Sequence, residues 1–478
     1  MTDNSKDSPQ IILGRVPPVT SDNPSFTGDQ LNRKGFAERL TNYIDRLREG
    51  TVIAVDAPWG EGKTWFGRNW EKMLKERDHE ALYLDAFSHD YIEDPFLALS
   101  AQILNLLKEG DNLTDGLADK AAAVAKALIP AGTTIAVNIA ARWFLGAPDF
   151  SEAIRGALAA GADASEPGLS DAIKKKLTHY EKDKASIEAF RSQLAEFCKQ
   201  QEKPVVFFID ELDRCRPSFA VQTIERIKHF FEVPNLVFVL LINRSQLETA
   251  ITGAYGAIDS HRYLGKFLSL TFRFPGNDRV PGQEGAQKAR YIHAVLSRYH
   301  ISTPPLGLKR KAPLFPDGLA FIAEVFGLSL RDLEQAIALS VLANPGLLTG
   351  GYLALVVGLK IAYPILFRAM REKRLPEFDK AAQILEDWVD RSVKAGQSQG
   401  IFMADEVYQY IVWLKLCASS IAREDTTVLL LQQGLLQQEN PSITISSDMQ
   451  DSPSRLFYLS LFIDLAARIE CGITIDRP

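Results

Sequence analysis

The residues with the clearest chemical potential are a lysine and a threonine that follow a glycine-bearing turn. The apolar run Thr51–Asp56 predicts a strand, and the turn after it places Gly60 and Gly62 just before Lys63 and Thr64. In such a turn the backbone N–H groups face the phosphates of a nucleotide, the ammonium reaches the same oxygens, and the hydroxyl ligates Mg²⁺. The spacing therefore predicts a site for the β- and γ-phosphates together with Mg²⁺.

The residues after the turn predict a helix whose N-terminus meets these phosphates. Large apolar side chains recur there at helical spacing, namely Trp65, Phe66, Trp70, Met73 and Leu74. The aligned peptide dipoles at a helix N-terminus favour negative charge. A strand–turn–helix without a ligand is the plainer interpretation, but strand before and helix after are the context that a phosphate loop requires. We therefore assign the whole turn to the nucleotide site, with Trp59, Glu61 and Trp65 beside the glycines.

The turn departs from the pattern G-x-x-x-x-G-K-[ST] at its first position, where Ala57 stands in place of glycine. The methyl group is tolerated if the backbone φ there is negative and is strained if φ is positive. The conformation of the turn decides between these two outcomes.

A second apolar run supplies the acidic groups that a magnesium–nucleotide site needs. Val205–Asp210 is apolar up to its final carboxylate, and Glu211 follows. Continuous apolarity is typical of a central parallel strand, and ligands of parallel sheets bind at the carboxyl ends of the strands. We expect Asp210 to hold Mg²⁺, directly or through water, and Glu211 to polarise the attacking water. Two acids that merely end a strand are the alternative, and the presence of the Lys63 turn argues against it.

The turn and the acidic segment together resemble the KAP family of P-loop NTPases. The most specific parts are Ala57–Thr64, with tryptophan at its third position, and Ile209–Cys215, with the pattern D-[DE]-L-D-R-C. Weaker counterparts extend the resemblance over most of residues 26–370. They are Asp29–Arg33, Leu84–Phe87, Val237–Arg244, Tyr263–Phe267 and Leu330–Glu334. The resemblance implies an ATP- and Mg²⁺-dependent P-loop NTPase.

Three positions differ from the usual residues of that family: Ala57, Asp85 and Asn243. We assign Asn243 to the nucleotide site, because its amide can hydrogen-bond a γ-phosphate or a water molecule. The amide cannot act as a base or as a charged metal ligand. Slow turnover, or binding without turnover, is therefore compatible with the sequence, although the lysine, the threonine and both acids are present.

An arginine usually stabilises the transition state of phosphoryl transfer, and another subunit can supply it. The candidates are Arg214 after the acidic strand, Arg244 after the run Leu236–Ile242, and Arg331 at the start of a helix in the C-terminal region. For any one of them, an ordinary surface or salt-bridged arginine is the plainer interpretation.

The order of elements predicts an α/β fold, a P-loop NTPase parallel sheet flanked by helices, with a helical C-terminal region. Helical segments separate five runs that we expect to be buried parallel strands. These runs are Thr51–Asp56, Ala81–Ala86, Val205–Asp210, Leu236–Ile242 and Leu268–Phe274. Helices are expected later over Ala286–Tyr299, Gly318–Phe326, Leu330–Leu342 and Tyr352–Met370.

These patterns divide the chain into three parts. We expect a flexible N-terminal segment over residues 1–25, a P-loop NTPase domain over 26–275 and a helical domain over 276–478. A helical insertion interrupts the NTPase domain at about residues 107–186. Within it, residues 127–146 have nearly the length of a membrane span, but Arg142 alone costs about 2.5 kcal/mol or more at mid-membrane. A packed or amphipathic helix is therefore favoured over a span.

Bulk properties are those of an ordinary soluble protein of about two to three domains. The net charge of 54 − 60 = −6 argues against broad binding to nucleic acid, and the cluster Lys174–Lys176 is expected to be a solvated helix face. The cysteines form no C-x-x-C pair, which favours a reducing cytoplasm over a disulfide framework or zinc site. They are Cys198, Cys215, Cys417 and Cys471.

Two functions from different classes remain open. The first is an ATPase that works as a conformational switch or in assembly, whose helical region changes position with the γ-phosphate and signals to a protein partner. The resemblance suggests anti-phage defence, with an operon-encoded partner and a homo-oligomer as options. The second is a nucleotide-stabilised scaffold, or a signalling adaptor peripheral to the inner membrane, with little turnover. Phosphate release by the purified protein separates the two.

Overall fold

The computed structural model describes residues 23–92, 194–228, 233–275, 284–299, 315–343, 351–394 and 410–415. It also describes short pieces near residues 95–103, 188–192, 417–418 and 462–469, and residue 301. Four expectations lie outside this part of the chain. They are the N-terminal segment up to residue 22, the insertion at 107–186, its membrane candidate at 127–146, and the cluster Lys174–Lys176.

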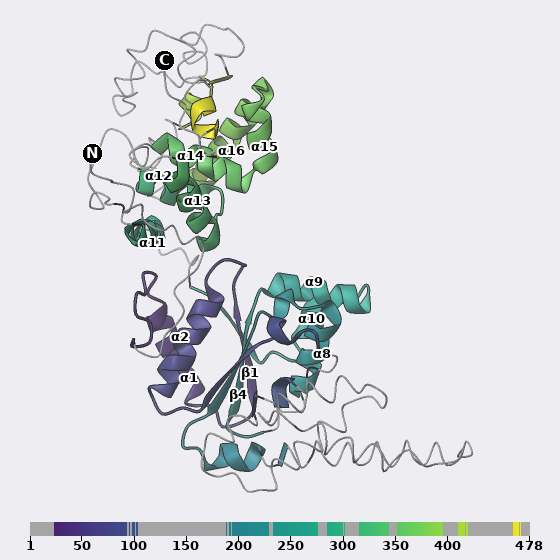
Figure 1. The fold of residues 1–478 in the computed structure, drawn as a ribbon. Coiled ribbons are helices and arrows are strands. Elements are labelled where there is room, and N and C mark those ends of the chain that lie inside the picture. The colour runs from purple at the N-terminus through teal and green to yellow at the C-terminus, as the bar shows by residue number, and fades with distance from the viewer. Residues whose placement is uncertain are drawn as a thin grey trace, which may run out of the picture.

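Five parallel strands form one sheet in the first part of the chain (Figure 1). They are β1 (Thr51–Asp56), β2 (Ala81–Asp85), β3 (Val205–Asp210), β4 (Leu236–Ile242) and β5 (Leu270–Arg273). Their order is β2-β3-β4-β1-β5, and every neighbouring pair is parallel. The register pairs Asp85 with Asp210 and Asp56 with Ile242, so these strands end at the same edge. The predicted parallel sheet is confirmed.

Helices cover both faces of this sheet (Figure 1). On one face lie α1 (Arg33–Ile44) and α2 (Lys63–Lys75). On the other lie α8 (Pro217–Lys228), α9 (Arg244–Tyr255) and α10 (Ser260–Leu264). Alternate residues of each central strand enter the two cores, and all seven residues of β4 are buried. Burial on both faces explains why these strands are apolar throughout.

Helix α2 approaches the sheet most closely at Gly67. A Cβ atom there would lie 2.2 Å from Leu241 Cδ1 and 3.1 Å from two atoms of the Tyr83 side chain. Glycine in a helix interior costs about 0.5–1 kcal/mol relative to alanine. The close approach of helix and sheet is the reason that this position holds glycine.

We expect the same substitution to have opposite effects in two helices. Gly67→Ala overfills the helix–sheet contact and should lower the free energy of unfolding by about 1–3 kcal/mol. Gly253→Ala in α9 meets no atom within 4 Å, so it should raise that free energy by about 0.5–1 kcal/mol through helix propensity. Urea unfolding of both variants measures the pair, and shifts of equal sign would contradict this packing.

The C-terminal region is helical and has a hydrophobic core of its own (Figure 1). Its helices are α11 (Glu284–Arg298), α12 (Phe315–Val325), α13 (Leu330–Ala343), α14 (Gly351–Ala362), α15 (Pro364–Arg371) and α16 (Leu375–Lys394). Trp413 and Phe462 are fully buried in this core, so parts of the last hundred residues belong to it. None of the described helices is both long and apolar enough to cross a bilayer.

Two expectations about elements were wrong. The single helix predicted over Tyr352–Met370 is two helices, because the chain leaves the helical conformation at Tyr363 (φ −132°, ψ 62°) and Pro364 starts α15. Proline disfavours the helical conformation in the preceding residue and suits the first helical position itself. The run Leu268–Phe274 was expected to be a buried strand, but β5 lies at the edge of the sheet, is largely exposed and, within the described part of the chain, pairs only with β1.

Candidate functional site

The turn after β1 forms a cradle at the N-terminus of α2. Gly60 (φ 86°) and Gly62 (φ 80°) have left-handed backbone conformations, which glycine adopts without strain. Ala57 is not among the described residues with positive φ, and its N–H donates to the carbonyl of Ile242 at 3.0 Å. The alanine at the first loop position is therefore accommodated without strain.

The ammonium of Lys63 lies inside this turn. Lys63 is the first residue of α2 and is only 8% exposed. Its Nζ donates to the carbonyls of Ala57 at 2.7 Å and Pro58 at 3.1 Å. Burial lowers the pKa of the ammonium, whereas the carboxylates of Asp213 and Asp210 oppose that shift. The turn thus holds a positive charge surrounded by its own backbone and faced by acids.

Asp210 ends β3 and is almost fully buried, with 1% of its surface exposed. Its Oδ2 accepts a hydrogen bond from the Tyr83 hydroxyl at 2.7 Å, and its Oδ1 accepts one from the Glu211 N–H at 2.8 Å. Burial raises the pKa of Asp210, and hydrogen bonds from Thr64, Tyr83 and Glu211 oppose the rise. Sequence reasoning missed Tyr83, whose role follows only from the pairing of β2 with β3.

Glu211 is held next to Thr64 by a strained backbone. Its φ of 60° and ψ of 20° are left-handed, a conformation that costs a non-glycine residue about 1–3 kcal/mol and gathers at functional sites. Its Oε1 accepts from Thr64 Oγ1 at 3.2 Å, and its Oε2 lies 2.5 Å from Arg214 Nη1. Burial raises the pKa of Glu211, and Asp210 adds to the rise while Arg214 opposes it. The Thr64 hydroxyl therefore lies against the carboxylate of Glu211, directly after the residue that ends β3.

Trp59 ties the turn to the segment after β3. Its indole N–H donates to Oδ2 of Asp213, while the residue as a whole remains 43% exposed. Asp213 is 9% exposed, and its Oδ1 has no hydrogen-bond partner within the described part of the chain. The sequence placed Asp213 inside the family pattern but gave it no role, because nothing in the spacing places it beside Trp59.

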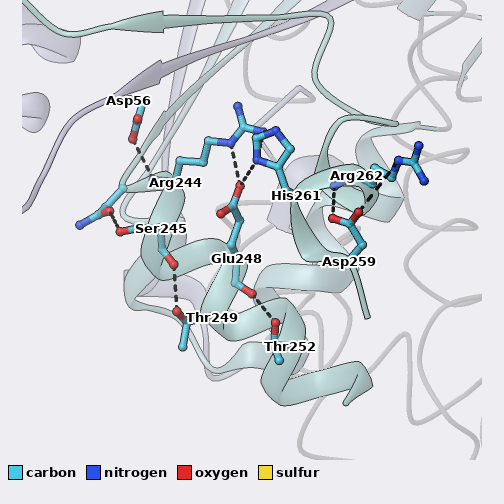
Figure 2. A network of polar contacts seen from close by, with 10 residues as sticks. Asp56, Arg244, Ser245, Glu248, Thr249, Thr252, Asp259, His261 and Arg262 are labelled. Atoms are coloured by element: carbon cyan, nitrogen blue, oxygen red, sulfur yellow. Dashed lines mark hydrogen bonds and ion pairs between the residues drawn. The ribbon is translucent and has the colours of Figure 1, made fainter. Parts of the chain in front are cut away.

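The backbone of Arg244 lies at the same edge of the sheet as the acidic residues. Its N–H donates to Asp56 Oδ1 at 2.8 Å, so the carboxylate that ends β1 caps α9. Figure 2 shows its guanidinium turned toward Glu248 and His261, with Nε 2.9 Å from Glu248 Oε1 and Nη2 3.2 Å from His261 Nδ1. The preceding Asn243 accepts a hydrogen bond from a neighbouring serine hydroxyl at 2.9 Å.

The helical region contacts the turn through the start of α13. The Arg331 N–H donates to the Gly60 carbonyl at 3.2 Å, and a Cβ on Gly60 would lie 2.4 Å from Ser329 Oγ. Ser329 caps α13, since its N–H and hydroxyl donate to Asp332 Oδ2 at 2.9 and 2.7 Å and the Asp332 N–H returns to Ser329 Oγ at 3.3 Å. This is a capping box. Sequence reasoning named Arg331 but missed Ser329.

The structure therefore brings most of the expected site residues to one edge of the sheet. Lys63, Thr64, Asp210, Glu211 and Arg214 are linked by direct contacts or lie on the same turn. A lysine in a glycine turn at a helix N-terminus, with a buried and a half-buried acid at the end of a central parallel strand, defines a P-loop NTPase.

Comparison with known families agrees with this class. Residues 33–287, more than half of the chain, match the profile of the KAP family P-loop domain. The protein belongs to the KAP family of P-loop NTPases.

Two further proteins are similar to parts of this chain. A stretch of 192 residues is 22% identical to the phage T7 exclusion protein of Escherichia coli (strain K12). The match covers 39% of this chain and 25% of the other, so it spans about a quarter of the length of that protein. The structure of the Aeropyrum pernix ORC2 protein, in ADPNP–ADP complexes, aligns over 91% of this chain and 86% of its own, at 12% identity and a TM-score of 0.32.

Proposed function

We propose that this protein is a Mg²⁺-dependent ATPase that acts as a conformational switch. The observation that carries the proposal is the meeting of Lys63, Thr64, Asp210 and Glu211 at one edge of the sheet, on a turn that touches the helical region through Gly60.

Phosphoryl transfer requires mainly that the reacting groups are positioned and that the negative charge of the phosphates is neutralised. The turn amides and Lys63 bind the β- and γ-phosphates. The Thr64 hydroxyl and the Asp210 carboxylate fit Mg²⁺, which takes one or two oxygen ligands from the protein and the rest from phosphate and water. The metal, when bound, neutralises the developing charge. Glu211, in contact with Thr64, orients the attacking water.

The three candidate arginines differ in how the structure holds them. Arg214 forms an ion pair with Glu211, and Arg331 contacts Gly60 through its backbone while its side chain is exposed. The Arg244 guanidinium is held by Glu248, a residue of α9 outside the phosphate site, whereas the glutamate that holds Arg214 belongs to the site itself. We therefore propose Arg214 or Arg331 as the arginine that meets the phosphates.

The contact at Gly60 favours the switch over the scaffold. A turn that fills with phosphates changes the surface on which the start of α13 rests, so the helical region can respond to the nucleotide. The similarity to a protein that excludes phage T7 supports a role in defence against phage. We propose that, in this defence, the ATPase signals to a protein partner in the cytoplasm. The ATPase acts there as a homo-oligomer or as a monomer.

Steady-state phosphate release by the purified protein tests this function. The switch requires release that depends on Mg²⁺ and on ATP and that is lost in Lys63→Ala. Lys75→Ala, an exposed lysine at the other end of α2 that pairs with Glu71, is the matched control. A protein that binds ATP tightly and releases no phosphate would be the scaffold instead.

The hydroxyl of Tyr83 should determine the pH range in which the protein binds Mg-ATP. Tyr83→Phe keeps the ring stacked on Phe208 but removes the donor to the Asp210 carboxylate. The pKa of Asp210, already raised by burial, then rises further. Because Mg²⁺ needs the ionised carboxylate, affinity falls as pH drops through that pKa, and the fall should begin at a higher pH in the variant.

Calorimetric titration of Mg-ATP from acidic to neutral pH measures this shift. Tyr43→Phe, on the same face of the sheet and packed on Phe272, is the control. Superimposable pH profiles for wild type and Tyr83→Phe would contradict the assignment.

A further inference from the structure

Two nitrogen atoms of a buried arginine, Arg33, have no hydrogen-bond acceptor in the part of the chain that the structure describes. Arg33, the first residue of α1, is 3% exposed, and its Nε and Nη1 have no hydrogen-bond acceptor among the described residues. Its Cζ lies 3.7 Å from the centroid of the Phe274 ring. A buried cation whose hydrogen bonds are unmade is strongly destabilising. The position therefore calls for an acceptor that the described part of the chain does not provide.

The neighbouring carboxylates do not meet this need. Asp29 uses both oxygens to cap α1, accepting from the N–H of Leu31 at 3.1 Å and of Lys34 at 2.8 Å. Arg33 also sits in the first turn of its helix, where the dipole disfavours a cation and where the turn itself contains no acidic residue. Burial lowers the pKa of the Arg33 guanidinium to about 10, with Glu61 and Asp29 opposing.

The aromatic ring that contacts the guanidinium lies on one particular side of the sheet's central strand β1. Phe274, on which it stacks, follows β5 and donates its N–H to the Asp56 carbonyl at 2.9 Å. Strand β5 flanks β1 on one side, whereas β3 with Asp210 and Glu211 lies on the other. If the terminal phosphate meets these acids, the nucleoside end of the same nucleotide points toward β5. Arg33 is therefore placed at the nucleoside end, and the charge of Glu61 in the turn opposes the lowering of the Arg33 pKa by burial.

We propose that Arg33 binds the nucleoside of the nucleotide, donating hydrogen bonds to acceptor atoms of the purine base or ribose. The proposal rests on the nucleotide site described above. It adds a nucleotide-binding residue that lies outside the glycine turn and outside the acidic residues after β3. A guanidinium suits this task, because it presents several N–H donors in a fixed plane and carries no acceptor.

The test compares two ligands and two arginines of the same helix. Arg33→Met keeps the apolar stem, Arg33→Lys keeps the charge but not the planar fork of donors, and Arg39→Met replaces an exposed arginine near Phe36. Dissociation constants for Mg-ATP and Mg-tripolyphosphate are measured by calorimetry, and thermal unfolding is followed without ligand. Tripolyphosphate carries all three phosphates but no nucleoside. A loss of affinity for Mg-ATP alone therefore reports the contact between Arg33 and the nucleoside.

We expect Arg33→Met to weaken Mg-ATP by about tenfold or more and to leave Mg-tripolyphosphate unchanged. The unfolding midpoint without ligand should not fall, because the substitution removes an uncompensated buried charge. Arg33→Lys should lose part of the affinity for Mg-ATP, less than Arg33→Met loses. Arg39→Met should bind Mg-ATP as tightly as the wild type.

Two outcomes would overturn this assignment. Unchanged affinity of Arg33→Met for Mg-ATP would show that Arg33 does not contact the nucleotide. If the unfolding midpoint of that variant also fell, the role of Arg33 would be structural. Equal weakening of both ligands would place Arg33 on the phosphates instead of the nucleoside. Failure of the wild type to bind either ligand would instead reject the proposed function, and the two failures are thus distinguishable.

Discussion

Replacing Glu211 with glutamine is expected to lower the rate of ATP hydrolysis by about 10²–10⁴-fold while ATP stays bound. Glutamine has nearly the shape of glutamate and can still accept the hydrogen bond from Thr64 Oγ1. It cannot take a proton from water or keep the ion pair with Arg214. The phosphates, held by the turn and Lys63, keep their ligands, so the variant should accumulate in the ATP-bound form.

Single-turnover hydrolysis and equilibrium binding, measured on the same preparation, check this result. Glu248→Gln removes a carboxylate that also pairs with an arginine but lies on α9, and it is the matched control. Loss of binding together with hydrolysis would mean that Glu211 positions the nucleotide. Unchanged hydrolysis would show that the water is oriented by another group.

Placing alanine at Gly60 is expected to disrupt the contact between the turn and the helical region. The backbone φ of 86° strains any side chain, and the new Cβ would lie 2.4 Å from Ser329 Oγ and 3.2 Å from Arg331 Cβ. Strain and overpacking together should lower the free energy of unfolding by about 1–3 kcal/mol or more. The variant should also lose any change in the helical region that depends on the nucleotide, because α13 can no longer rest on the turn.

Hydrogen exchange of α13, with and without Mg-ATP, measures this coupling, and urea unfolding measures the stability. Gly28→Ala is the matched control, since its φ of 80° is similar but its Cβ would meet nothing within 4 Å. The difference between the two variants isolates the contact from the backbone strain. If both variants keep the same response of α13 to nucleotide, the contact at Gly60 does not transmit the signal.

Much of this site could be predicted because its signals are local. The lysine, threonine and glycines occupy one turn, and the two acids directly follow a run whose burial on both faces makes it apolar throughout. The location of the buried strands β1 to β4 follows from the same apolarity. The edge position of β5 does not, because strand order depends on contacts between distant segments.

The residues that sequence reasoning missed are those whose partners lie far along the chain. Tyr83 meets Asp210 only through the register of two strands, and Ser329 meets Gly60 only when the helical region packs on the turn. Arg33 appears in the family pattern, but its burial without partners emerges only once Phe274 covers it. The helix break at Pro364 was a different error, since apolar spacing continues through it and outweighed the proline.

Calorimetric titration of the folded protein with Mg-ATP tests the central claim most directly. One nucleotide should bind per chain in the wild type, and Lys63→Ala should give no binding heat at the same concentrations while its unfolding remains cooperative. Binding that is equally strong in both proteins, or absent from a correctly folded wild type, would contradict a triphosphate site in the turn after β1.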